Sequence, residues 1–331
     1  MINEVHAPPK AARHMLRWTP TRWLAVCAAP LLGYQLWTIF GWLSDSPHQV
    51  MAFREAGTAS WFAARLAELL VVVAMAGFIW KAVHDRRRLG RLNTDALLVI
   101  GAFTSAFWDP IYNWFTPAWM YSSNFINTSD WFAHAPGIVN PDAGSMPWPI
   151  IIVGVGYPVW CVGFAALVNA AMSWVARRRS AISSLALVSM AFVVSGSITV
   201  VAFGIFQAFD LMNAPGFRLG FLGNSQLLFF FYSGGLVFGG FACLRYFRDS
   251  AGKSLVERDP NGAVRILASI AACQLIVIIG WGLLTAPFSL HPSPYPTLPR
   301  HLVNGLCDTP GTQGSAYGAC PGSPTFQLPT K

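Results

Sequence analysis

The sequence predicts an all-α integral membrane protein, a bundle of about seven transmembrane helices with its N-terminus inside and its C-terminus outside. Its 331 residues are 54% hydrophobic and only 11% charged, whereas about 25% of the residues of a soluble domain are charged. Several uncharged apolar runs are about 20 residues long, the length that crosses a hydrocarbon core about 30 Å thick. These observations exclude a soluble enzyme, a nucleic-acid-binding protein and a disordered chain.

Seven apolar runs define the spans. The first follows a basic stretch like that of a signal peptide, but it is longer than a signal-peptide core and no small-x-small cleavage site follows it, so we expect a retained helix. In the sixth, the glycines between Ser233 and Gly240 indicate close helix packing. The predicted spans are 23–43, 60–81, 96–115, 149–174, 183–208, 224–245 and 264–287.

The basic residues orient the bundle. With the N-terminus in the cytoplasm, 17 of the 22 Lys and Arg residues fall in inside segments, as the positive-inside rule requires. The net charge of +8 therefore indicates orientation in the membrane and not nucleic-acid binding. We expect a multi-pass protein of a bacterial plasma membrane. The four inside segments are 1–22, 81–95, 175–182 and 245–265.

Three parts follow from this topology: a basic cytoplasmic segment (1–22), the seven-helix domain (23–287) and an outer tail (288–331). The tail is rich in Pro, Gly, Ser and Thr and has little with which to form a core. It carries Cys307 and Cys320. On an oxidising side of the membrane they could close a disulfide loop, or they could remain free thiols in a disordered tail.

Three acidic residues lie in the outer half of the membrane, where a carboxylate is costly unless it is paired, protonated or in contact with water. Glu68 lies in the second span, and Arg65, one turn away, offers a structural ion pair as the alternative to a catalytic role. Asp210 ends the fifth span and shares a helix face with Gln207, while Asn224 begins the sixth. The third residue is Asp109. The clustering of these acids near one level of the membrane is the main functional signal.

Asp109 lies at the outer end of the third span in a motif of aromatic and polar residues, Trp108-Asp109-Pro110-Ile111-Tyr112-Asn113-Trp114. Pro110 cannot donate an N–H and disfavours helical geometry at the residue before it, so we expect the helix to kink or open here. Asp109 and Asn113 are four apart and should share a face, with Tyr112 beside them. An opened turn beside a carboxyl, an amide and a phenol can bind a polar oxygen, although Asp109 could also be only an interfacial cap.

The outer connection 116–148 is longer than ordinary loops, which favours a lid or a binding role. Its aromatic residues could fold over a cavity or rest at the lipid interface. Asp130 and His134 are four apart and Asp142 follows, but a zinc site usually needs more His or Cys ligands, so we expect no metal. His134 is a candidate proton carrier or hydrogen-bond donor, or an ordinary loop histidine. Walker, dinucleotide-binding and hydrolase motifs are missing, so we expect cofactor-free proton chemistry.

The seven spans, the Trp108-Asp109-Pro110-x-x-Asn113-Trp114 motif and the long aromatic loop after it resemble the avermectin-type spirocyclase (AveC) family of multi-span membrane proteins. The resemblance covers residues 20–290, approximately. The best-understood members close a dihydroxy-ketone polyketide into a spiroketal, sometimes with a dehydration. The resemblance therefore implies an apolar substrate with hydroxyl and keto groups, a lipid bilayer around the protein and no nucleic-acid partner. It carries over only to the residues of the Asp109–Asn113 motif.

Spiroketal closure passes through an oxocarbenium ion, which glycosidases handle with two carboxyl groups. On this basis Asp109 is the expected general acid, oriented by Asn113 and Tyr112, because burial favours a protonated carboxyl. Glu68 or Asp210 would be the base and cation stabiliser. Trp108 and Trp114 could add cation–π stabilisation.

Two alternatives stay open. Another membrane cyclase or isomerase, for example one acting on a prenyl chain, would use the same acid in an apolar cavity. A non-enzymatic carrier or binding protein for a lipid or polyketide is the second, although a transporter should place polar residues through the inner half of the membrane as well. The oligomeric state and the substrate are not predicted.

Overall fold

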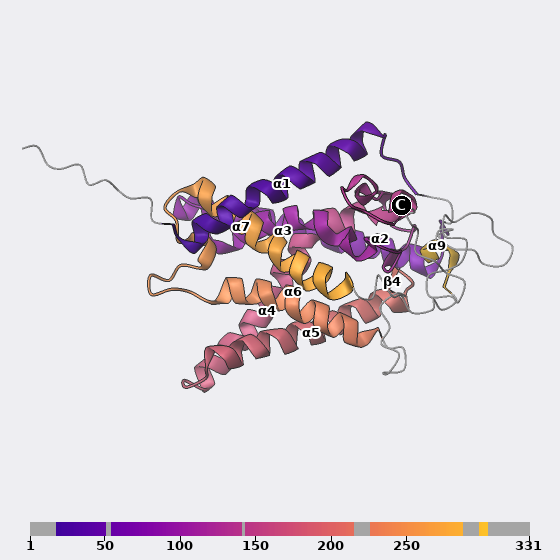
Figure 1. The fold of residues 1–331 in the computed structure, drawn as a ribbon. Helices are drawn as coiled ribbons and strands as arrows, with labels where there is room; N and C mark the ends of the chain where they lie inside the picture. The colour runs from indigo at the N-terminus through magenta and orange to yellow at the C-terminus, as the bar shows by residue number, and fades with distance from the viewer. Residues whose placement is uncertain (1–17, 51–53, 141–142, 215–225, 287–297, 304–331) are drawn as a thin grey trace, which may run out of the picture.

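Long helices form a single bundle in the computed structural model, which describes residues 18–50, 54–140, 143–214, 226–286 and 298–303. They run side by side along one axis (Figure 1). Six helices of the described residues are long and apolar enough to cross a membrane, which confirms the all-α membrane fold. They are α1 (Pro20–Ser44), α2 (Ala59–Leu89), α4 (Tyr157–Arg178), α5 (Ser184–Ala208), α6 (Leu227–Tyr246) and α7 (Gly262–Val277) with its π-helical continuation η7 (Ile278–Leu283).

The third predicted span, 96–115, is not one of these six helices. The chain there forms a short α-helix, α3 (Thr94–Ser105), which continues as a 3-10 helix, η1 (Ala106–Asn113). Pro110 favours the change, because it has no N–H to donate to the carbonyl of Ala106. The helix therefore changes geometry around Asp109, where the sequence predicts a kink or an opened turn, but the turn is tightened and not opened.

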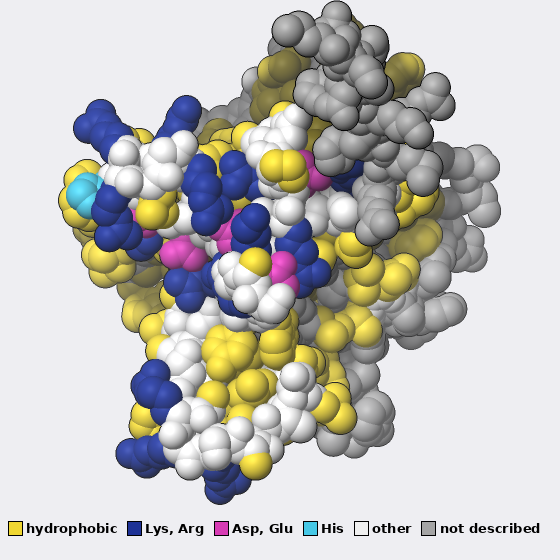
Figure 2. Space-filling view, turned by 90° about the vertical axis from the view of Figure 1, so that its left-hand side faces the viewer, with side chains coloured by type: hydrophobic (Ala, Val, Ile, Leu, Met, Phe, Trp, Pro, Cys, Tyr) yellow, Lys and Arg dark blue, Asp and Glu magenta, His cyan; other side chains and the backbone are white. Residues whose placement is uncertain are grey.

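One end of the bundle gathers the basic residues (Figure 2). It holds the end of α2, the start of α3 and the α4–α5 and α6–α7 connections. Acidic side chains neutralise part of this charge: Lys81 binds Asp85 at 2.6 Å, and Arg245 binds Asp95 at 2.7 Å. The predicted inside segments thus share one end within the described residues, and the assignment of that end to the cytoplasm stays a prediction.

Glycines allow α6 to approach α5 closely, as predicted from the sequence. A side chain at Gly234 would overlap Thr199 of α5, and one at Gly235 would overlap Phe192. Contact between the two backbones is therefore possible only with a hydrogen atom at these positions. This packing fixes α5 beside the wall of the cavity described below.

The long connection between η1 and α4 folds into a cap over the other end of the bundle. Two short antiparallel pairs hold it. The strand β1 (Met120–Tyr121) pairs with β4 (Met212–Asn213), and β2 (Asn127–Ser129) pairs with β3 (Pro147–Pro149). Short 3-10 turns complete it: η2 (Trp131–His134) and η3 (Ala143–Ser145).

The aromatic residues of this cap are buried inside the protein. Trp119 and Trp148 are each 2% exposed, and Phe125 and Phe132 are fully buried. The sequence left two locations open for these aromatic side chains, over a cavity or at the lipid interface. They lie in the interior of the cap. The strand pairs themselves were not anticipated, because each is only two or three residues long.

Candidate active site

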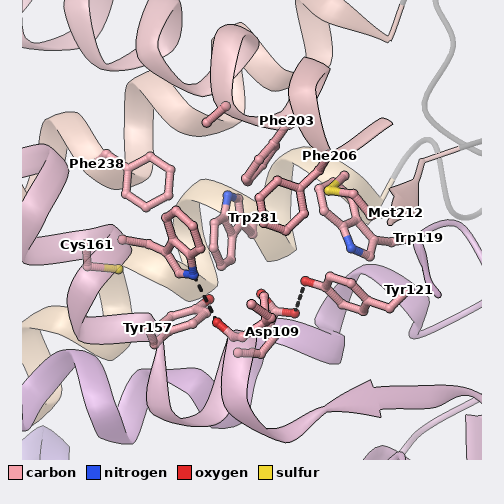
Figure 3. A pocket seen from close by; sticks show the side chains of 14 residues that line it. Asp109, Trp119, Tyr121, Tyr157, Cys161, Phe203, Phe206, Met212, Phe238 and Trp281 are labelled. Atoms are coloured by element: carbon pink, nitrogen blue, oxygen red, sulfur yellow. Dashed lines mark hydrogen bonds between the residues drawn. The ribbon is translucent and has the colours of Figure 1, made fainter. Parts of the chain in front are cut away.

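A small cavity lies beneath the cap, between η1, η7, α4 and α5 (Figure 3). Its volume is about 40 Å³, and since one water needs about 10–15 Å³ by this measure, it has room for about three. Most of its wall is apolar. The wall consists of Asp109, Trp119, Tyr121, Ile152, Val153, Tyr157, Trp160, Cys161, Ala202, Phe203, Phe206, Met212, Phe238 and Trp281.

Asp109 is the acidic residue in this wall, and it is 3% exposed. The Tyr121 hydroxyl of the cap donates a hydrogen bond to its Oδ2 at 2.8 Å (Figure 3). Burial, together with the Asp109 carboxyl, raises the pKa of Tyr121 well above its ordinary value, so Tyr121 remains a donor. The wall contains no Lys, Arg or His. The neighbours of Asp109 in the wall are therefore a phenol and aromatic rings, and not a cation.

Three departures from α-helical geometry surround Asp109. The residue itself lies in the 3-10 helix η1, Ile152 and Val153 belong to the π-helix η4 (Ile150–Val155), and Trp281 belongs to the π-helix η7. Irregular turns of this kind are frequent at functional sites. The local backbone thus sets which side chains reach the cavity.

The prediction that Asp109 and Asn113 share a helix face is wrong. In a 3-10 helix, residues four apart are separated by about 120° around the axis, compared with about 40° in an α-helix. Asn113 instead holds the cap, because its side chain accepts from Trp119 N at 2.8 Å and donates to Trp119 O at 2.9 Å. Tyr112 stacks on the Trp119 ring, 4.7 Å between centroids. Both residues support the cavity wall from behind.

Trp108 and Trp114 line a separate groove of about 290 Å³ between η1 and η7. The groove is almost entirely apolar, and the Trp108 indole N–H donates to Gln274 at 3.0 Å. It lies one residue away from the cavity on both helices, since Trp108 precedes Asp109 and Gly282 follows Trp281. Neighbouring residues of the same two helices therefore line the groove and the cavity.

Glu68 does not line the cavity. Its Oε2 lies 2.9 Å from Arg65 Nη1, and its Oε1 accepts from the backbone N–H of Ile126 at 2.7 Å. Arg65 also donates to the backbone carbonyl of Asn124. The pair thus joins α2 to the cap, which is the structural alternative considered from the sequence.

The remaining sequence-based candidates also lie outside this wall. Asp210 adopts a positive φ of 51° after α5, and its backbone carbonyl faces His301. Gln207 donates to Gln226 at the start of α6. His134 lies 3.5 Å from Asp45 at the end of α1. Three further candidates lie outside the described residues: Asn224, Cys307 and Cys320.

Asp130 is a buried carboxyl of the cap, and it is 1% exposed. Its Oδ1 accepts from Phe132 N at 2.8 Å, while its Oδ2 has no hydrogen-bond partner within the described residues. Burial raises the pKa of Asp130 to about 8, and the Asp109 charge adds to this rise. The two carboxyl groups are therefore electrostatically coupled. No group of three or more potential metal ligands occurs in the described part of the chain.

Sequence reasoning found Asp109 but missed most of its neighbours. Four of them were not singled out as site residues, and they come from three places in the chain: Tyr121 from β1, Tyr157 and Trp160 from α4, and Trp281 from η7. One signal was available for Trp281, which stands between Gly280 and Gly282 in an apolar span. A tryptophan flanked by glycines suggests a large side chain at a point of close approach.

Comparison with known proteins gives one match. The family model described as "Spirocyclase AveC-like" matches residues 86–295, more than half of the chain. No curated protein and no solved structure matches. The matched range contains the cap and every residue of the cavity wall, whereas Glu68 lies before it.

Proposed function

Because the chain belongs to the AveC-like spirocyclase family, we propose that it closes an apolar dihydroxy ketone into a spiroketal, with loss of water, in the cavity around Asp109. The family supports a spirocyclase-type or cyclase role in general. One observation carries the finer proposal: a carboxyl that is 3% exposed lies in an aromatic wall without a basic residue. Such a group can supply a proton where water and competing cations are excluded.

The reaction needs one proton donor that later accepts a proton. Addition of the first hydroxyl to the ketone gives a hemiketal. Asp109 gives its proton to the hemiketal hydroxyl. The C–O bond then breaks, water departs, and an oxocarbenium ion remains. The second substrate hydroxyl attacks this carbon, and its proton returns to the Asp109 carboxylate. The acid is restored, and one water is lost overall.

The neighbours of Asp109 suit the charged stage of this sequence. Tyr121 donates to Oδ2 at 2.8 Å and stabilises the carboxylate while the cation exists. The rings of Trp119 and Trp281 offer π-faces to the oxocarbenium ion. Burial under the cap limits the access of bulk water, which would otherwise capture the cation.

The second carboxyl of the sequence-based mechanism is better supplied by Asp130 than by Glu68 or Asp210. Its charge interacts with that of Asp109, whereas Glu68 is bound to Arg65. Asp130 does not line the cavity, so in this proposal it does not act on the substrate directly.

A long substrate exceeds a cavity of about 40 Å³. We place its apolar remainder in the groove lined by Trp108 and Trp114, between η1 and η7. In this arrangement the reacting oxygens enter the cavity between the side chains of these two helices.

Metabolite profiling by accurate mass tests the proposal. Cells that lack this gene are complemented with the wild type, with Asp109→Asn, or with Trp80→Phe, a matched expression control whose side chain is 70% exposed on the outside of α2. We expect the deletion strain and Asp109→Asn to accumulate a species heavier than the product by one water, with a free ketone and hydroxyl groups. The wild type and Trp80→Phe should remove it.

Three results would contradict the proposal. Full conversion by Asp109→Asn would exclude Asp109 as the acid. A compound that changes sides of the membrane without changing mass would favour a carrier, and a product with a carbocyclic ring would favour another class of cyclase.

A further inference from the structure

Three side chains of the cavity wall each hold a buried donor without a hydrogen-bond partner. The donors are Trp119 Nε1, Tyr157 Oη and Trp281 Nε1, and they complete no hydrogen bond within the described residues. Their side chains are 2%, 2% and 3% exposed. A buried donor without an acceptor destabilises the folded state. Three of them around one small cavity therefore need an explanation.

Two of these donors lie near polar groups of the wall without bonding to them. Tyr157 lies within hydrogen-bonding range of Asp109, and Trp119 within that of Tyr121. Neither donor has the distance and angle of a formed hydrogen bond there. Both donors are therefore left with a hydrogen atom for another acceptor.

Some comparable donors are satisfied, although the Trp148 indole N–H, in the cap and outside the cavity wall, is also unpaired within the described residues. Trp160 lines the same cavity, and its indole N–H donates to the Ile152 carbonyl at 2.9 Å. Outside the cavity, Trp131 donates to Phe107 O at 3.0 Å. The three unpaired donors come from the cap, the start of α4 and η7, so one local distortion cannot account for them.

The chemistry of the wall defines the missing acceptor. An indole N–H can donate but cannot accept, and the charged group in the wall, Asp109, is acidic. An anion such as a phosphate or a carboxylate would therefore meet a carboxyl and no cation. The rings of Phe203, Phe206 and Phe238 complete a surface for hydrocarbon. A neutral, oxygen-containing hydrocarbon fits this combination.

We propose that Trp119, Tyr157 and Trp281 bind the ether or ketone oxygens of the substrate and hold its reacting carbon beside Asp109. They are positioning residues, and this role rests on the function proposed above. Figure 3 shows the three side chains around the same space as Asp109. The consequence is selectivity, because a ligand of the same shape without oxygens leaves the donors unpaired and is rejected.

Indole N–H resonances report this binding directly. The protein is labelled with ¹⁵N-tryptophan and purified in detergent micelles, and the Trp119, Trp281 and Trp160 signals are assigned from single Trp→Phe variants. Two probes are compared: tetrahydropyran, one ring of a simple spiroketal, and cyclohexane, which has nearly the same shape but no oxygen. Each probe partitions into the micelles to the same extent for every variant, so differences between variants report on the site.

We expect tetrahydropyran to move the Trp119 and Trp281 N–H protons downfield, as a new hydrogen bond does, and cyclohexane to leave them in place. The Trp160 signal should stay, because its N–H is already bonded. Tyr157→Phe should weaken tetrahydropyran binding about two- to tenfold, as expected for one hydrogen bond. Trp160→Phe is the matched stability control. Of the four residues Trp119, Tyr157, Trp160 and Trp281, Trp160 is the one whose donor has already formed a hydrogen bond.

The inference is overturned if both probes shift the signals equally, or if neither shifts them although all indole peaks show a folded protein. Its failure is separable from that of the proposed function. Oxygen-dependent shifts together with full turnover by Asp109→Asn would leave the binding site in place and refute the acid. Turnover that depends on Asp109, without any indole response, would refute only the positioning donors.

Discussion

The ion pair between Arg65 and Glu68 should contribute strongly to stability, because it lies at the junction of α2 and the cap. Glu68 is 4% exposed, and its Oε1 also accepts from Ile126 N. Removing one partner of a fully buried pair costs about 3–5 kcal/mol. The Arg65 side chain is 24% exposed, so solvent screens part of this. We expect Glu68→Ala to lower the free energy of unfolding by about 2–4 kcal/mol.

A double-mutant cycle measures how much of this loss in the free energy of unfolding comes from the interaction between Arg65 and Glu68. Unfolding is followed by SDS titration in mixed micelles for Glu68→Ala, Arg65→Ala and the double variant. The coupling between the two residues should be about 1–3 kcal/mol. The Lys81–Asp85 pair at the basic end, whose lysine side chain is 50% exposed, is the matched control, and it should show a smaller coupling. If the two single effects simply add at positions 65 and 68, the pair does not hold the cap and the reasoning fails.

Three further predictions concern the cavity and the bundle. Tyr121→Phe removes the hydrogen bond to Asp109 and, at about 1.5–3 kcal/mol for a bond to a charged group, should slow product formation about 10- to 150-fold in complemented cells. Gly234→Ala should destabilise the protein by about 1–3 kcal/mol through overlap with Thr199, and Thr199→Gly in the same chain should recover most of this in a thermal unfolding assay. The pKa of Asp130 rises from 3.8 to about 8 in the folded state, which thus retains a proton that the unfolded chain releases. Stability should therefore fall as pH rises from 4 to 8, approximately, and Asp130→Asn should flatten this dependence.

Each of these has a result that would contradict it. Tyr34→Phe removes a phenol that donates to Pro136 O and not to Asp109, so an equal loss of product in both Tyr variants would count against a specific role of Tyr121. A stable Gly234→Ala variant would mean that the contact between α5 and α6 is looser than described. An unchanged pH dependence in Asp130→Asn would assign the effect to another group.

The sequence was sufficient for the spans because their signal is local. Each span is an apolar run of fixed length, and Pro110 marks the break in the third through its missing N–H. Asp109 could be found in the same way, because an acid in an apolar run is conspicuous by itself. The family resemblance depended on this motif too, and the family model bears it out.

The surroundings of Asp109 depend on non-local contacts, which a linear pattern does not contain. Asn113 was placed on the same helix face as Asp109 because α-helical spacing was assumed. The 3-10 geometry of η1 puts the two side chains on different faces. Tyr121 reaches Asp109 because β1 pairs with β4, more than 90 residues further along the chain. Strands of two residues have no periodicity to detect, so the cap and the phenol it delivers became visible only in the structure.

Because of the π-helical turns η4 and η7, the geometry of the site depends on the exact number of residues in these two segments. A π-turn is equivalent to an α-helix with one inserted residue, and one residue rotates the rest of the helix by about 100°. Deleting a single residue within Ile278–Leu283 would restore α-helical geometry, yet it would turn Trp281 or its neighbours away from the cavity. A protein that has an α-helical turn in place of either π-turn would have to be aligned with a one-residue gap there, or the two chains would be compared in the wrong register.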